Sequence, residues 1–164
     1  MEEQSTIRVL LIDDEETLLE YLAKRLLKIG FTVKAAFSGP EAIQTAREEH
    51  FDVAVVDLKM PEMDGVETQK QLKEVQPFLQ CIVLTGHGSI ESALESGQHE
   101  AFDYLMKPVD YDKLVDVIKK AYKKKVALQD TKFREQVEEI YRAGLGAHGT
   151  RKAMNELRKI YGIE

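Results

Sequence analysis

Cysteine is nearly absent from the sequence, and long apolar runs are absent altogether. The single cysteine, Cys81, cannot form an intramolecular disulfide, and its place in the apolar run Cys81–Leu84 predicts a small buried thiol. No apolar run approaches the roughly 20 residues that span a bilayer, and the N-terminus lacks the basic and apolar character of a signal peptide. We therefore expect a cytoplasmic protein with no membrane segment.

An excess of positive charge is lacking too. The formal net charge is −6, so generic attraction to nucleic acid or to an anionic membrane is not expected. With 43% hydrophobic and 32% charged residues, the composition is that of a globular protein. Residues 1–125 contain 23 acidic and 16 basic residues, whereas residues 126–164 contain 6 and 7. We predict a first domain over residues 1–125 and a helical extension over residues 126–164.

Short apolar runs alternate with amphipathic stretches along the first domain. The runs predict five strands, at residues 7–12, 31–37, 53–56, 81–84 and 102–106. A helix is expected after each strand, beginning near Thr17, Ser38, Val66, Ser89 and Asp110. Strands that are apolar throughout and separated by helices indicate a parallel sheet covered on both faces. The predicted fold class is therefore α/β, a doubly wound domain.

Polar side chains follow these strands at their ends. Asp13 and Asp14 follow the first strand, Asp57 the third, Thr85 the fourth and Lys107 the fifth. In open α/β sheets, sites form in the crevice at the carboxyl ends of the strands, so these side chains are expected to converge. Taken singly, each has a structural alternative, such as a helix cap for the first aspartates or a turn for the third. Their common placement favours a single site.

The chemistry of this set fits phosphoryl transfer. Three carboxylates close together raise one another's pKa unless a cation joins them. Mg²⁺ suits such oxygen ligands, with Mn²⁺ as an alternative ion. The metal and a lysine together neutralise charge on a transferring phosphoryl group, and a hydroxyl such as that of Thr85 can hydrogen-bond to it. A carboxylate can itself be the nucleophile, which gives an acyl phosphate.

Four ordered segments carry a family resemblance: LLIDDE, VVDLKMPEMDG, IVLTGHGS and AFDYLMKP. They resemble the successive signatures of bacterial response-regulator receiver domains, over about residues 6–125. The resemblance implies a flavodoxin-like (βα)5 fold with a five-stranded parallel sheet in the order 2-1-3-4-5. It also implies a phosphoprotein of a two-component system, with a sensor histidine kinase as partner. Such a protein is not an enzyme beyond its own phosphorylation and dephosphorylation.

The resemblance assigns a role to each residue at the crevice. Asp57 is implied to be the phosphoacceptor. Asp13, Asp14, Asp57 and the backbone carbonyl of Lys59 are implied to hold Mg²⁺, and Lys107 is implied to pair with the phosphoryl group. No other cofactor is implied.

Further residues receive roles from the same resemblance. Thr85 and Tyr104 are implied to be a switch pair, in which the hydroxyl moves toward phosphate and the ring follows inward. Lys59 and His87 stand two residues after the phosphoacceptor and the threonine, where receivers tune dephosphorylation; for His87 a solvent-facing loop position is an equal alternative. A cis peptide is expected at Lys107-Pro108.

One stretch departs from the family pattern. Glu100 stands where receivers commonly carry glycine, and His99 stands where an apolar residue is usual. Gly97 weakens a helix by about 1 kcal/mol relative to alanine. We expect the fourth helix to end early, on the face through which receivers normally signal.

The extension has the pattern of two amphipathic helices. Thr131–Ala143 forms the first, Gly144–Gly149 interrupts it, and Thr150 is expected to cap the second. The apolar phase slips near Lys124, which predicts a changed face or a break within the helix that leads into the extension. Two helices of this size cannot bury a core alone, so they are expected to pack on the receiver, on a partner or on a second copy.

Several outputs fit these features. We favour protein contacts or self-association, including a homodimer on phosphorylation, through helix 4, strand 5, helix 5 and the tail; no downstream partner is named by the resemblance. The alternative is a transcription regulator with a DNA-binding tail or a further output domain, although the near-neutral, glycine-interrupted tail disfavours DNA binding. An aspartyl-phosphate phosphatase is disfavoured because Lys59 stands where such hydrolases need a second aspartate. Asp13-Asp14 would repel the phosphate of a bound FMN.

Overall fold

The structure is a computed structural model that describes residues 6–86, Glu91 and residues 101–163. The chain divides into two compact units, Met1–Lys123 and Lys124–Glu164, and each is described by itself. The expected fourth helix, with its early end near Glu100, lies outside the described residues.

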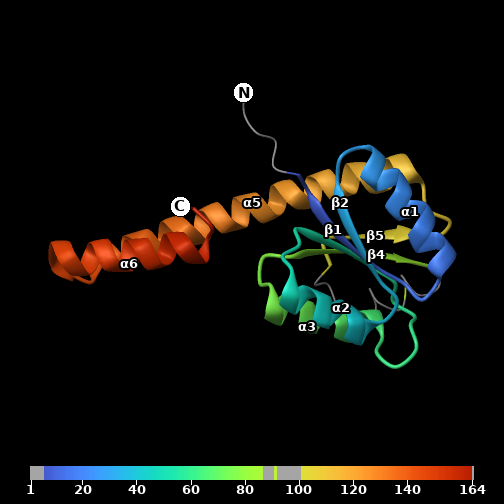
Figure 1. Cartoon of the computed structure of the whole chain (residues 1–164), viewed down its shortest axis with the longest axis horizontal. Helices are drawn as coiled ribbons and strands as arrows, with labels where there is room; N and C mark the ends of the chain where they lie inside the picture. Colours follow the sequence, from blue (N-terminus) through green and yellow to red (C-terminus); the bar gives the residue numbers. More distant parts are fainter. Residues whose placement is uncertain (1–5, 87–90, 92–100, 164) are drawn as a thin grey trace. The chain divides into compact units, whose positions relative to one another are not determined.

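Five parallel strands form one sheet in the first unit (Figure 1). Their bounds are β1 Arg8–Ile12, β2 Thr32–Ala36, β3 Val53–Val56, β4 Gln80–Thr85 and β5 Asp103–Met106. The order across the sheet is β2-β1-β3-β4-β5. This order confirms the flavodoxin-like α/β fold that the sequence predicts.

Helices cover both faces of the sheet. Their bounds are α1 Glu16–Lys28, α2 Gly39–Glu48, α3 Gly65–Val75 and α5 Tyr111–Arg142, of which only the first part of α5 belongs to this unit. On one face lie α1 and the first part of α5, and on the other lie α2 and α3 (Figure 1). Alternate residues of the strands point to opposite faces: Leu11 and Val55 pack in the cluster with α1 and α5, Leu10 and Ala54 in the cluster with α2 and α3. Cys81 is fully buried in the second cluster, which confirms the predicted buried thiol.

Local sequence explains where the helices begin and end. The Ser38 hydroxyl accepts a hydrogen bond from the Glu41 backbone N–H and caps α2, with Pro40 in the first turn. The Asp64 carboxylate accepts one from the Glu67 N–H (2.9 Å) and caps α3. After α1, Gly30 adopts a φ of +99°, a left-handed conformation that glycine reaches without steric cost.

Gln76, the C-cap of α3, connects the C-terminal end of α3 with the C-terminal end of α2. Its side-chain amide donates to the carbonyls of Ala46 (2.7 Å) and Glu49 (2.8 Å). Its side-chain oxygen accepts from the backbone N–H of Phe51 (3.0 Å). One side chain therefore satisfies one backbone group in the last turn of α2 and two in the loop that leads into β3.

Gln76→Ala is expected to lower the free energy of unfolding by about 1–3 kcal/mol, because partly buried backbone groups lose their partners. Urea unfolding of the full chain, followed by far-UV circular dichroism, measures this change. Gln44→Ala is the control: its side chain is exposed and donates a hydrogen bond to the exposed Glu48 on the same helix, so the change should stay within about 0.5 kcal/mol. Equal effects of the two substitutions would contradict the structural role of Gln76.

The second unit is a helical hairpin. The helix α5 continues without a break to Arg142, and α6 spans Gly146–Ile160. The predicted cap at Thr150 is therefore wrong: α6 begins four residues earlier. Two glycines with positive φ, Gly144 (+62°) and Gly146 (+71°), complete the turn within a short segment, so the helix resumes sooner than the glycine-rich sequence suggests.

The two helices of this hairpin meet along an apolar seam. The rings of Phe133 and Tyr161 contact edge to face with centroids 5.3 Å apart, and the Tyr161 hydroxyl donates to the Gln136 side chain. Leu157 is the one apolar side chain that is buried in the described part of this unit. Among the described residues, no helix is both long and apolar enough to cross a membrane.

Candidate functional site

The register of the sheet brings Asp13 and Asp57 side by side. Ile12 of β1 pairs with Val56 of β3, so the next residue of each chain segment lies at the same edge. The backbone N–H of Asp57 donates to the Ile12 carbonyl (3.0 Å), and that of Asp13 donates to the Ala36 carbonyl (3.2 Å). These bonds extend the ladder by one residue and fix both aspartates relative to the sheet.

Three carboxylates gather at this edge. Oxygens of Asp13, Asp14 and Asp57 all lie within 4.8 Å of one another. Asp13 and Asp57 are buried, whereas Asp14 is exposed. A hard cation that takes oxygen ligands and keeps several waters would suit such a group, because the exposed Asp14 places it in contact with solvent.

Lys107, which follows β5, reaches into the same cluster. Its ammonium lies 2.7 Å from Asp13 Oδ2, 3.2 Å from Glu15 Oε1 and 3.3 Å from Asp57 Oδ2. Burial alone would lower the pKa of Lys107, but the hydrogen bonds to Asp13 and Glu15 and the charges of Asp13 and Asp57 outweigh it and raise the pKa. The lysine is therefore a permanent cation in this crevice. Its peptide bond to Pro108 is cis, as expected.

The surroundings of Asp13 disfavour the ionised form of its carboxyl group. Burial raises its pKa above the ordinary value and the nearby charge of Asp57 adds to this, while the hydrogen bonds from Lys107 and from the Glu15 backbone oppose it. The hydrogen bond from Lys107 thus offsets the effect of burial on Asp13 only in part. A divalent cation would complete the compensation.

Backbone donors hold the other oxygens of the two buried carboxylates. The N–H of Glu15 donates to Asp13 Oδ1 (3.0 Å), and the N–H of Lys59 donates to Asp57 Oδ1 (3.2 Å). Both bonds close tight turns two residues long. The alternative role of Asp13 as a helix cap does not apply, because the N-cap of α1 is Glu15 and no side chain caps it.

Thr85 and Tyr104 lie on neighbouring strands at one face of the sheet. Thr85 ends β4 and is 1% exposed. On β5, Tyr104 pairs with Val83, which stands two residues before Thr85 on β4. Tyr104 also packs against Val83 and Leu58 in a small apolar cluster. The tyrosine ring is half-buried, and this burial raises the pKa of its hydroxyl.

Of the two residues predicted to tune dephosphorylation, the structure describes Lys59 alone. Lys59 is exposed beside Asp57, to which its backbone N–H is bonded. His87 lies outside the described residues.

Two residues of the site were missed by the sequence interpretation. Glu15 supplies the third carboxylate to Lys107; the run of four acidic residues after β1 was the available signal, but only Asp13 and Asp14 of that run received a role. Gly65 lies directly against the chain at Asp57: a Cβ there would be 2.7 Å from the Leu58 Cα and closer still to the Asp57 carbonyl oxygen. Asp-Gly before a helix signals a turn, but it does not reveal this contact.

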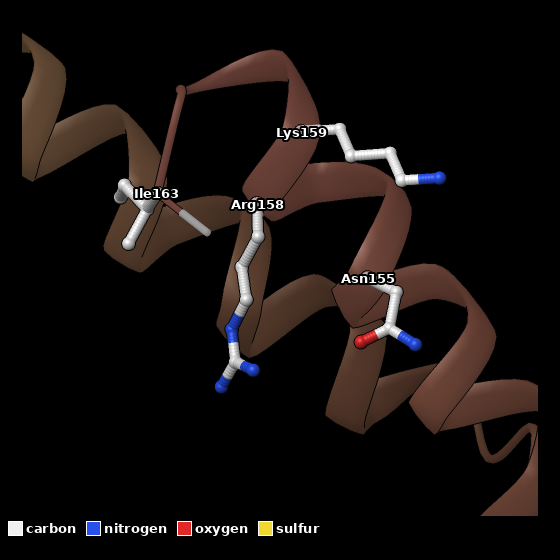
Figure 2. Close-up of a pocket in the computed structure, with 4 residues that line it drawn as sticks. All are labelled: Asn155, Arg158, Lys159 and Ile163. Carbon is white, nitrogen blue, oxygen red and sulfur yellow. The ribbon is translucent and has the colours of Figure 1, made fainter.

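The second unit offers a hollow of different character. A cavity of about 510 Å³ is lined by Asn155, Arg158, Lys159 and Ile163. In the view of Figure 2, Arg158 and Asn155 extend downward from α6, whereas Lys159 extends to the right. This lining supplies two cations and an amide but no carboxylate, so the carboxylate cluster at the edge of the sheet is the better candidate for a metal-dependent site.

Comparison with protein families matches residues 9–119 to the response regulator receiver domain. The transcriptional regulatory protein GlrR of Escherichia coli (strain K12) is 38% identical over 129 residues, which is 79% of this chain and 29% of GlrR. The transcriptional regulatory protein ZraR of Klebsiella oxytoca is 34% identical over 152 residues, 92% of this chain and 33% of ZraR. The chain thus spans about a third of the length of these curated relatives.

Solved structures show the same architecture. A receiver domain from Clostridium thermocellum superposes with a TM-score of 0.69 at 34% identity, covering 74% of this chain and 98% of that one. The response regulator TrrA of Thermotoga maritima, solved in complex with Mg²⁺-BeF, gives 0.63 at 28% identity and covers 71% of this chain and 99% of TrrA.

Proposed function

Because the chain belongs to the response regulator receiver domain family, we propose that Asp57 accepts a phosphoryl group from a sensor histidine kinase in a Mg²⁺-dependent reaction. The observation that carries this proposal is the meeting of Asp13, Asp14, Asp57 and Lys107 at one edge of the sheet. The expected location is the cytoplasm, where kinase and regulator meet.

Asp57 is the nucleophile. An Oδ atom attacks the phosphorus of a phosphohistidine, a P–O bond forms, the P–N bond breaks, and its electron pair stays on the imidazole. The bond from the Lys59 N–H to Oδ1 and the bond from Lys107 to Oδ2 orient the carboxylate for this attack. Positioning of this kind is a large part of phosphoryl-transfer catalysis.

Charge compensation comes from Lys107 and a metal. Asp13, Asp14, Asp57 and the backbone carbonyl of Lys59 would hold Mg²⁺, which when bound shares the negative charge of carboxylates and phosphoryl oxygens. Lys107 contributes a fixed positive charge next to Asp57. Lys59 and His87, by their sequence positions next to Asp57 and Thr85, are proposed to tune the loss of the phosphoryl group.

Thr85 and Tyr104 respond to the charge of the phosphoryl group on Asp57. A phosphoryl group adds about −1.5 to −2 charges at the crevice. The Thr85 hydroxyl is drawn to a phosphoryl oxygen, and the half-buried ring of Tyr104, which packs on the same face, follows it inward. The surface near β5 and α5 changes as a result and delivers the signal by protein contacts or by self-association, with the helical extension as part of this output.

Incubation of the full chain with a small phosphodonor tests the phosphorylation. We expect one phosphoryl group per chain by intact mass in the presence of Mg²⁺, no modification in EDTA, and loss of the group in alkali or hydroxylamine, because these nucleophiles cleave an acyl phosphate. Modification that is independent of Mg²⁺, or stable to hydroxylamine, would contradict an aspartyl-phosphate at this site.

The curated relatives favour a second candidate for the output, because GlrR and ZraR are both transcriptional regulatory proteins. In this alternative the receiver governs DNA binding. A mobility-shift assay over a series of salt concentrations separates the two, since phosphate contacts make DNA affinity fall steeply with salt. Salt-dependent binding supports transcription, and phosphorylation-dependent self-association without it supports protein contacts.

A further inference from the structure

Lys107 uses all of its donors on carboxylates, and one of the three partners is not a candidate metal ligand. An ammonium group has three N–H donors, and its three partners are Asp13, Glu15 and Asp57. Asp13 and Asp57 belong to the carboxylate group that could hold a metal, whereas Glu15 does not. Among the described residues, Lys107 is also the one hydrogen-bond partner of the Glu15 carboxylate.

In this arrangement the Lys107 ammonium and a divalent metal ion would compete for the same carboxylates. Lys107 bonds to the Oδ2 atoms of Asp13 and Asp57, the residues whose oxygens a divalent ion would take. A metal at these carboxylates both repels the ammonium and competes for its acceptors. Lys107 therefore needs another acceptor close by if it is to stay in the crevice while the metal enters.

We propose that Glu15 is a positioning residue that serves as the second anchor of Lys107, holding the ammonium at the rim of the crevice and thereby releasing Asp13 and Asp57 for the metal. The inference rests on the metal site of the proposed function. Glu15 suits this role because its backbone N–H is bonded to Asp13 Oδ1, which fixes the residue beside the crevice. Its side chain is 62% exposed, so it can follow the ammonium outward without being desolvated.

Titration of Mg²⁺ into the full chain by calorimetry, without any phosphodonor, tests the anchor. Glu15→Gln should weaken Mg²⁺ binding about two- to fivefold, the range expected for an exposed ion pair, because Lys107 then stays on Asp13 and Asp57. Glu16→Gln removes the same charge in the first turn of α1 but leaves the three carboxylate partners of Lys107 in place, so it should leave the affinity unchanged. Equal affinities of Glu15→Gln and Glu16→Gln would overturn the proposal.

Two more variants separate the contact from a general effect of charge. Glu15→Asp keeps the charge but is one methylene shorter, so it should weaken Mg²⁺ binding as Glu15→Gln does. In a Lys107→Met background, Glu15→Gln should have no further effect, because the competing cation is gone. A wild-type affinity for Glu15→Asp, or an undiminished effect of Glu15→Gln beside Lys107→Met, would show that Glu15 acts through its charge alone.

The proposed function and the anchor fail in different ways. If Mg²⁺ binds and Glu15→Gln weakens its binding as expected, but no phosphoryl group is transferred, the proposed phosphorylation is overturned and the role of Glu15 is upheld. Wild-type affinity in Glu15→Gln, together with normal phosphorylation, would overturn the anchor alone. Absence of Mg²⁺ binding to the wild-type chain would overturn both.

Discussion

Asp57→Ala is expected to abolish phosphate incorporation from a small phosphodonor in the presence of Mg²⁺. The substitution removes the nucleophile itself, so no other feature of the crevice can compensate. It also removes one of the three carboxylates that gather at the edge of the sheet, which should weaken Mg²⁺ binding. Intact mass spectrometry of the full chain, before and after incubation, measures the loss directly.

The loss should not come from unfolding. The charge of Asp57 contributes to raising the pKa of Asp13, so its removal relieves a repulsion between two buried carboxylates. Asp57→Asn, which keeps the shape of the side chain, should likewise remain unmodified while melting no lower than the wild type. Asp130→Ala, in the exposed part of α5, is the control and should be modified normally. Undiminished modification of Asp57→Ala would place the phosphoacceptor elsewhere.

Gly65→Ala is expected to lower both stability and phosphorylation. The backbone of Gly65 donates to the Leu58 carbonyl (2.9 Å), and an added Cβ would lie within 3 Å of backbone atoms of Asp57 and Leu58. The φ of Gly65 is not in the left-handed region, so the requirement for glycine is one of space and not of conformation. Backbone atoms cannot turn away as a side chain can, so the start of α3 and the loop after Asp57 must separate.

The expected cost in stability is about 1–3 kcal/mol, as for other overpacked sites. The phosphorylation rate should fall at least about tenfold, because a displacement of roughly 1 Å in reacting groups can cost 100-fold. Urea unfolding and the time course of modification measure the two effects. Gly86→Ala is the matched control for stability, since its Cβ would meet nothing within 4 Å. A Gly65→Ala chain as stable as Gly86→Ala would show that the loop has room to move.

Much of the fold and the site was predictable because the sheet imposes a regular geometry. Apolar runs that each end in a polar residue predict parallel strands in register, and such strands place Asp13 and Asp57 side by side whatever the loops do. Lys107 and Thr85 follow from the same regularity. The order of the strands and the roles of these residues came from the family resemblance, which four motifs carry.

The parts that were missed depend on the paths of loops. The reach of Glu15 toward Lys107 is set by the turn after β1, and the contact of Gly65 with Asp57 by the loop after β3. In that loop Glu62 adopts a φ of +68°, which a non-glycine residue seldom does and which no local pattern predicts. The early start of α6 likewise depends on Gly144 and Gly146, whose positive φ angles turn the chain within three residues after α5 ends.

The burial of Cys81 gives the molecule a built-in reporter of local opening. This thiol, the sole cysteine of the chain, is 0% exposed in β4 and pairs with Ala54, three residues before Asp57. A thiol reagent can reach it only when the centre of the sheet separates from α2 and α3, so the rate of alkylation reports how often that happens. Any ligand that binds only the closed state must slow this reaction in proportion to its occupancy, which makes one buried sulfur a gauge of events at the crevice.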